Sequence, residues 1–187
     1  MSGRFGLGVV SCLGLLVIVV SIGCGASQVK KDAGAPTADD PAFLSSVESC
    51  NYGSGVACAS AGSVMWTQAE EDTTLDPATR KSRYALARDY FRRACNMGVT
   101  DSCLLFAQCV YEGKGGPKNV AEAEVAAGRS CAADNALGCA LQAVILLKDI
   151  GTEDAIQTGA EALFKSCNLG YKPSCELIES VMKDITD

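Results

Sequence analysis

Eight cysteines in this chain form four pairs, and the two members of each pair lie eight positions apart. The pairs are Cys50/Cys58, Cys95/Cys103, Cys131/Cys139 and Cys167/Cys175. Cysteine can bind zinc, carry out thiol redox chemistry or form structural disulfides. The chain lacks the short Cys-x-x-Cys motif that structural zinc sites favour and that thioredoxin-like sites need. The pairs therefore indicate structural disulfides, and we expect neither a metal ion nor another cofactor.

The pairs also define an internal repeat. Cys95, Cys131 and Cys167 lie 36 residues apart, which is a period typical of repeat arrays. The step from Cys50 to Cys95 is nine residues longer, and the extra length falls in the polar segment 70–81. Insertions in such arrays lie in loops on one face, so we expect a loop here that marks a recognition feature.

The residues around each pair follow a helical pattern. Small or apolar residues recur before the first cysteine at spacings that make one face of a helix. Three positions after the first cysteine stands a residue suited to the left-handed end of a helix, which is glycine except in the third pair. A basic residue stands two positions before the first cysteine of the last three pairs. The two columns are Gly53, Gly98, Asp134 and Gly170, and Arg93, Arg129 and Lys165.

Each pair thus spans a corner between two helices. Eight residues of unbroken helix would separate the α-carbons by about 12 Å, whereas a disulfide needs about 4.4–6.8 Å. The chain reversal closes this distance, so the repeat selects local pairing within each corner. We predict an all-α fold, an α/α superhelix (solenoid) of about three and a half disulfide-stapled helix-turn-helix repeats. The expected helices are 42–51, 56–69, 78–96, 101–112, 119–132, 137–148, 155–168 and 173–185, with the last one closing the stack.

The N-terminal residues indicate export. Arg4 precedes the uncharged apolar stretch from Leu7 to Ile22, so we predict a signal peptide over residues 1–24. The end of this stretch resembles the lipobox of bacterial lipoproteins, which makes Cys24 the expected lipidation site. Cleavage by an ordinary signal peptidase and an uncleaved anchor are the alternatives. Residues 25–41 are expected to form a flexible tether, and residues 42–187 the repeat domain.

Composition excludes several functions. The net charge is −6 and there is no histidine, so nucleic acid is not an expected partner, and the commonest general base is missing. The Lys-Thr-Gly and Ser-Asp-Asn motifs of penicillin-binding serine enzymes are absent. We therefore assign no catalytic residue and no metal ligand.

The motif from Ala87 to Gly98, Ala-x-x-Tyr-Phe-x-Arg-Ala-Cys-Asn-Met-Gly, resembles the Sel-one-like repeat, a relative of the tetratricopeptide repeat. Cys103 and the string from Tyr111 to Gly115 extend the match, and the resemblance covers about residues 42–185. The paired cysteines resemble the secreted bacterial branch known from Helicobacter cysteine-rich proteins. The resemblance implies a scaffold that binds proteins or peptides. It also implies an alternative, a penicillin-binding or β-lactam-hydrolysing enzyme of the cell envelope.

Basic and aromatic side chains are the candidates for the binding surface. The segment 80–93 concentrates the basic residues of an acidic chain, which favours contact with an acidic partner, anionic lipid headgroups or cell-wall carboxylates. The aromatic residues favour a groove with good anchors. A solvated helix face and packing between repeats are the alternatives. The candidate residues are Trp66, Tyr84, Arg88, Arg92, Arg93 and Tyr111.

Cys109 is the odd cysteine within the repeats, and its repeat equivalents are apolar, so we expect a free buried thiol rather than a reactive or intermolecular one. Together these patterns predict a non-catalytic protein- or peptide-binding scaffold at the cell envelope. The expected location is that of an outer-membrane lipoprotein of a Gram-negative bacterium, and otherwise periplasmic or secreted.

Overall fold

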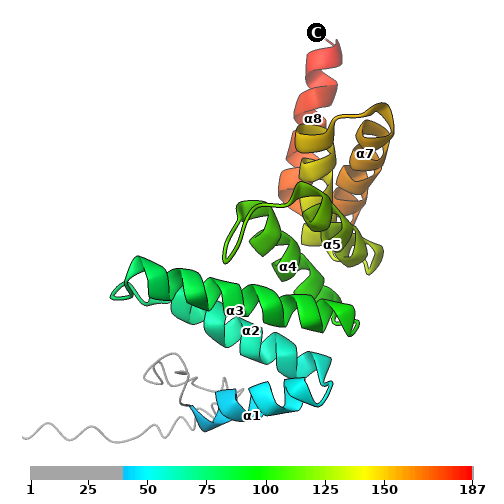
Figure 1. Ribbon diagram of the computed structural model, residues 1–187. Coiled ribbons are helices and arrows are strands. Elements are labelled where there is room, and N and C mark those ends of the chain that lie inside the picture. Colours follow the sequence, from blue (N-terminus) through cyan, green and yellow to red (C-terminus); the bar gives the residue numbers. More distant parts are fainter. Residues whose placement is uncertain (1–39, 187) are drawn as a thin grey trace, which may run out of the picture. The chain divides into compact units, whose positions relative to one another are not determined.

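The computed structural model describes residues 40–186, which form a succession of helices (Figure 1). The helices are α1 (Pro41–Asn51), α2 (Gly55–Glu71), α3 (Pro77–Asn96), α4 (Thr100–Glu112), α5 (Val120–Ala132), α6 (Ala136–Val144), α7 (Glu153–Asn168) and α8 (Lys172–Thr186), with the π-helix η1 (Ile145–Ile150) after α6. This confirms the all-α prediction. The predicted signal peptide, lipidated Cys24 and nearly all of the tether lie outside the described residues. Among those described, no helix is long and apolar enough to cross a membrane.

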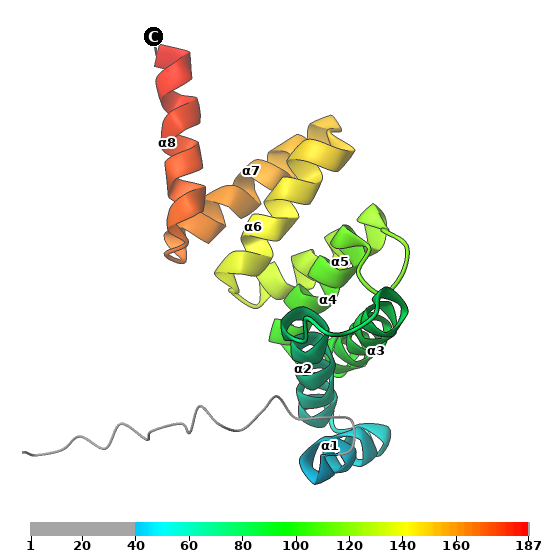
Figure 2. The ribbon, with the colours of Figure 1, turned by 90° about the vertical axis from the view of Figure 1, so that its left-hand side faces the viewer.

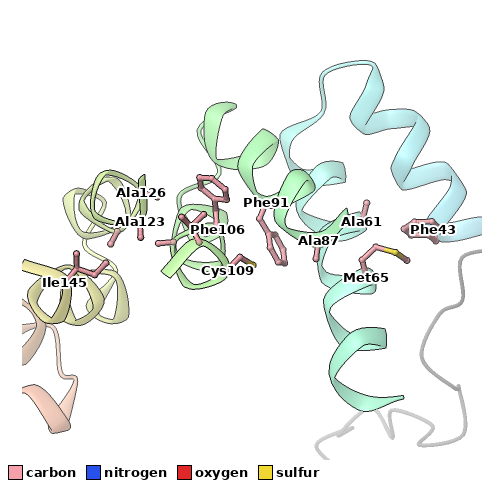
Figure 3. Packing of buried hydrophobic residues seen from close by; sticks show 13 residues of the cluster. Phe43, Ala61, Met65, Ala87, Phe91, Phe106, Cys109, Ala123, Ala126 and Ile145 are labelled. Atoms are coloured by element: carbon pink, nitrogen blue, oxygen red, sulfur yellow. The ribbon is translucent and has the colours of Figure 1, made fainter. Parts of the chain in front are cut away.

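Each helix packs on its neighbours in sequence, so the domain is an α/α solenoid of helix-turn-helix repeats (Figure 2). The main cluster of buried side chains runs through successive helices from Phe43 in α1 to Ile145 in η1 (Figure 3). Phe91 and Phe106 fill its middle, and small residues such as Ala87 let the helices approach closely.

Four disulfides close the four corners between helices. They join α1 to α2, α3 to α4, α5 to α6, and α7 to α8. The chain reverses in each corner at a residue in the left-handed conformation, as the glycine column of the sequence predicts. The φ angles are 92° at Gly53, 87° at Gly98, 59° at Asp134 and 91° at Gly170. The bonded pairs are Cys50–Cys58, Cys95–Cys103, Cys131–Cys139 and Cys167–Cys175.

The Cys131–Cys139 corner is slightly tighter than we expected. Its α-carbons lie 4.3 Å apart, just below the expected range of about 4.4–6.8 Å, whereas those of the other pairs lie 4.6–4.8 Å apart. Gly138, directly before Cys139, also lies close to the preceding helix, where a Cβ atom would meet Oγ of Ser130 at 2.5 Å. Cys139 has no exposed surface and belongs to a second buried cluster with Ala143 and Ala162. Larger residues precede the second cysteine of the other pairs, namely Ala57, Ser102 and Ser174.

The inserted segment is more helical than we predicted. Helix α2 continues to Glu71 and α3 begins at Pro77, so only five residues, 72–76, remain outside helices. Arg80 donates hydrogen bonds to the carbonyl oxygens of Ala69 and Asp72, the second at 2.8 Å. These bonds satisfy the C-terminal end of α2 and hold the short loop against α3.

The helix predicted over 137–148 also differs. It is α-helical only to Val144 and then becomes the π-helix η1. A π-helix contains one more residue per hydrogen-bonded ring than an α-helix, so side chains beyond Val144 point in shifted directions. Residues Leu147 and Lys148 lie on this segment.

Candidate functional site

Arg93 joins two repeats rather than pointing to solvent alone. Its guanidinium donates to the carbonyl oxygen of Cys50 at 3.1 Å and to Oδ1 of Asn51 at 3.0 Å. These acceptors lie at the C-terminal end of α1, where unpaired carbonyls and the helix dipole favour a positive charge. Arg93, which lies on α3, therefore caps the C-terminal end of α1, the equivalent helix of the preceding repeat.

The same contact recurs along the chain, and we call it the basic clamp. Arg129 donates to the carbonyl of Cys95 at 3.2 Å, and Lys165 to that of Cys131 at 2.8 Å. Each clamp residue stands two positions before the first cysteine of its own pair. The clamp thus explains the basic column of the sequence, whose partners were not predicted.

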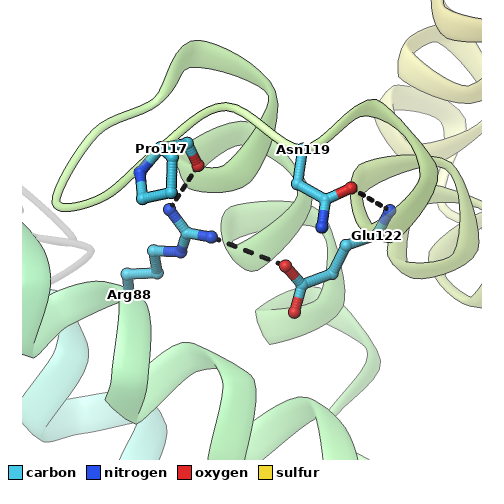
Figure 4. Close-up of polar contacts among 4 residues, drawn as sticks. All are labelled: Arg88, Pro117, Asn119 and Glu122. Atoms are coloured by element: carbon cyan, nitrogen blue, oxygen red, sulfur yellow. Dashed lines mark hydrogen bonds and ion pairs between the residues drawn. The ribbon is translucent and has the colours of Figure 1, made fainter.

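Arg88 fixes the connection between α4 and α5 (Figure 4). It donates to the carbonyl oxygen of Pro117 at 3.0 Å and pairs with Glu122 at 3.5 Å. Its side chain is only 16% exposed. Asn119 accepts a hydrogen bond from the backbone N–H of Glu122 at 3.2 Å and so caps the start of α5.

Trp66 and Tyr84 form an aromatic pair between α2 and α3, with ring centroids 5.4 Å apart. Lys114 Nζ lies 4.5 Å from the Trp66 ring centroid and 2.6 Å from Oε1 of Glu70. The hydrogen bond from Lys114 lowers the pKa of the Glu70 carboxyl, and burial raises the pKa of the Tyr84 hydroxyl. The cluster ties the loop after α4 to the preceding repeat.

Tyr111 stands one repeat after Trp66 at the equivalent position and makes the equivalent contact. Its hydroxyl donates to Asp149 at 2.7 Å, and Lys118 Nζ lies 4.1 Å from its ring centroid. The hydrogen bond from Tyr111 lowers the pKa of the Asp149 carboxyl.

Five of the six candidate residues therefore contact other repeats of the same chain. Arg92 is the exception, because its side chain is 51% exposed and its salt bridge goes to Asp89 on the same helix.

Cys109 is a free thiol with no exposed surface in the core. Burial away from water raises its pKa to about 12. Two buried serines bond to each other and to the backbone: Ser174 donates to Ser166 at 2.9 Å, and Ser166 donates to the carbonyl of Ala136 at 2.8 Å. Within residues 40–186, no group of three or more His, Cys, Asp or Glu side chains could hold a metal ion.

An open apolar groove lies at the C-terminal end of the domain. Its lining comes from α6 and η1, from α7 and from α8, with Gln108 of α4 at one end. Helices α6 and α8 both pack on α7 (Figure 2). Three adjoining cavities of about 330, 420 and 230 Å³ make up the groove, and Leu163 and Leu177 line all three.

The two ends of the groove differ in polarity. Near the start of α8, the apolar lining is interrupted by Gln108, Tyr171 and Ser174. Toward the end of α8, the lining consists of apolar residues alone: Leu147, Ala160, Leu163, Phe164, Leu177, Ile178, Val181 and Met182. This combination of a large apolar surface with a few polar groups at one end is typical of a ligand-binding site.

The groove exposes side chains that earlier repeats bury. Val181 is 50% exposed, whereas Cys109 and Ile145 at the equivalent positions have no exposed surface. Leu177 and Phe164 are 49% and 52% exposed. Several neighbouring apolar side chains of the groove therefore remain about half exposed to water.

The opposite face of α8 is polar, as expected for a helix that closes the stack. Glu179 is exposed at the position where Gly62, Ala107 and Ala143 are buried in earlier helices. The groove was not predicted, because residues 173–185 alone do not show how α8 sits relative to α6. The one signal of the groove in the sequence was the run of apolar residues on the last expected helix, such as Leu177 and Val181.

No protein-family model matches this chain, and no curated protein matches it. The described residues form an all-helical, repeat-like domain with four regularly spaced disulfides. Disulfides in this number indicate an oxidising, extracytoplasmic compartment.

Proposed function

We propose that this chain is an exported Sel-one-like repeat protein that binds a protein or peptide at the cell envelope without catalysing a reaction. The 36-residue period of the cysteine pairs and the motif from Ala87 to Gly98 support the family. The predicted signal peptide and lipidated Cys24 support a lipoprotein of the outer membrane. The disulfides support a location outside the cytoplasm, which agrees with export across the inner membrane.

The apolar groove between α6 and α8 is the observation that carries the binding function. Burying Val144, Phe164 and Leu177, each 43–52% exposed, would remove apolar surface from water and so favour association. Gln108 and the Tyr171 hydroxyl at the polar end supply hydrogen bonds that orient a peptide. The expected ligand is a segment that inserts two or more apolar side chains and places polar backbone groups at this end.

Crosslinking in cells, followed by affinity capture and mass spectrometry, tests this function. Two variants, Val144→Asp and Leu177→Asp, each place a charge in the groove. Leu86→Asp is the matched control, because Leu86 on α3 is 46% exposed and lies outside the groove. We expect the wild type and Leu86→Asp to capture the same partner and both groove variants to lose it.

A partner that all three variants retain would contradict the assignment of the groove. Loss of the partner on changing Arg92 to Glu, with no loss from the groove variants, would move the binding surface to the basic segment of α3. Circular dichroism of each purified variant shows that the helices are intact.

A further inference from the structure

Tyr90 fills a space between repeats that is left open one repeat later. Its ring packs against the Cys50–Cys58 corner together with Ala94 and Val99. The guanidinium of Arg93, the clamp residue, lies 5.8 Å from the ring centroid. The Tyr90 ring and the Arg93 guanidinium thus pack together at this corner.

Ala126 stands at the equivalent position of the next repeat, five residues before the first cysteine of its pair. It is 3% exposed and has no ring, and a cavity of about 350 Å³ lies beside it. The cavity is lined by Arg92, Cys95, Asn96, Phe106, Glu122, Val125, Ala126 and Arg129. Cys95 and Arg129 are the repeat equivalents of Cys50 and Arg93, so the cavity lies at the corner equivalent to the one against which Tyr90 packs.

Cationic side chains border this cavity. Arg129 bonds to the Cys95 carbonyl and to Asn96, and within the described residues no carboxylate pairs with it. Arg92 pairs with Asp89 three positions earlier on the same helix, and both side chains are about half exposed. Such an exposed pair is weak and exchanges readily for a better-placed carboxylate.

The other lining residues include apolar side chains and one carboxylate. Phe106 is 6% exposed and offers a ring against which a second ring can pack. Val125 is 59% exposed and forms a wall. The carboxylate of Glu122 pairs with Arg88 at 3.5 Å, which offsets its charge.

This chemistry is specific to one position in the repeat array. One repeat further, Gln142 stands where Phe106 stands in α4, and it donates to Glu124 at 3.1 Å. Gly128 replaces Arg92 there, and a Cβ atom on Gly128 would meet the Gln142 amide at 2.8 Å. The polar Gln142 amide thus occupies that space.

We propose that the cavity beside Ala126 binds a ligand that joins an aromatic ring to a carboxylate, such as the C-terminal aromatic residue of a peptide. The ring takes the place of the Tyr90 ring, between Phe106 and Arg129. The carboxylate accepts hydrogen bonds from Arg92, whose planar guanidinium suits it. The site is separate from the C-terminal groove and does not depend on it.

Ligand-observed NMR on the full chain tests the site, with acetyl-Gly-Gly-Phe as the probe. We expect the free acid to bind at least about tenfold more tightly than the C-terminal amide, because only the acid offers a carboxylate to Arg92. The Arg92→Gln variant should bind the acid as weakly as the wild type binds the amide. Arg83→Gln, which removes an arginine of the same helix outside the cavity, should leave binding unchanged.

The Ala126→Tyr variant blocks the site by restoring the missing ring, and we expect it to abolish binding while keeping the thermal midpoint. Equal affinity for acid and amide, or binding retained by a folded Ala126→Tyr variant, would overturn the proposal. If Ala126→Tyr fails to fold, unchanged binding by Arg92→Gln overturns it instead. A second probe, 3-phenylpropionate, distinguishes two sources of the ligand. Tighter binding of the tripeptide would identify a peptide C-terminus, and tighter binding of 3-phenylpropionate would identify a free aromatic acid.

Discussion

Arg93 and Cys50 are 43 positions apart in the chain, yet the Arg93 guanidinium donates a 3.1 Å hydrogen bond to the Cys50 carbonyl. The equivalent bonds of Arg129 and Lys165 make this a rule of the fold. Each disulfide closes a corner within a repeat, and each basic clamp ties that corner to the next one. The disulfides therefore act within a repeat, and the clamps act between neighbouring repeats.

Removal of one clamp should destabilise the domain. We expect Arg129→Ala to lower the free energy of unfolding by about 1–2 kcal/mol, because a carbonyl and a helix end lose a charged donor. Arg92→Ala removes an arginine whose salt bridge is to Asp89 on its own helix, and it should cost about 0.5 kcal/mol or less. Urea unfolding without reductant measures both, and equal losses would contradict the role of the clamp.

Gly115 allows the loop after α4 to touch α3. Its φ is 75°, and a Cβ atom there would overlap the backbone of Tyr84. We expect Gly115→Ala to cost about 2–5 kcal/mol, from left-handed strain plus steric overlap. Gly98→Ala is the matched control, because Gly98 has φ of 87° but no atom within 4 Å of the added Cβ. It should cost only about 1–2 kcal/mol, and thermal or urea unfolding of the two variants distinguishes them.

The thiol of Cys109 should be unreactive in the folded protein. With a pKa of about 12, only about one thiol in ten thousand is ionised at pH 8, and the side chain has no exposed surface. We expect no alkylation of Cys109 by iodoacetamide until the chain is unfolded, as followed by peptide mass mapping. Rapid alkylation in the native state would show that the thiol reaches solvent.

Mild reduction should open the Cys167–Cys175 disulfide first. Both of its cysteines are partly exposed, whereas the cysteines of the other three pairs are only 0–6% exposed. Cys139, for example, has no exposed surface. A reducing thiolate must reach a sulfur atom directly, so access sets the order of reduction. Differential alkylation with increasing dithiothreitol measures that order, and simultaneous loss of all four disulfides would contradict this prediction.

Local features of the fold could be read from the sequence. The helix boundaries agree with the predictions within two residues, apart from the change to a π-helix after Val144. Gly98 and its equivalents marked the corners because few residues adopt the left-handed conformation. Such signals are local, so they need no knowledge of which helices meet.

Partners from distant parts of the chain could not be read in this way. The basic column that contains Arg129 was visible, but its acceptor at Cys95 depends on how α5 lies beside α3. Trp66 and Tyr84 suggested a groove, yet they pack on each other. The C-terminal groove results from the angle between α6 and α8, which no single segment encodes.

Site-specific photocrosslinking in cells tests the central claim, that the groove binds a protein or peptide, most directly. A photoreactive phenylalanine analogue is placed at Leu177 in the groove, and at Leu86 as the control, since the two are 49% and 46% exposed. We predict a discrete crosslinked product from position 177 and none from position 86. Equal labelling from both positions, or none from position 177 in cells that express the folded protein, would contradict the claim.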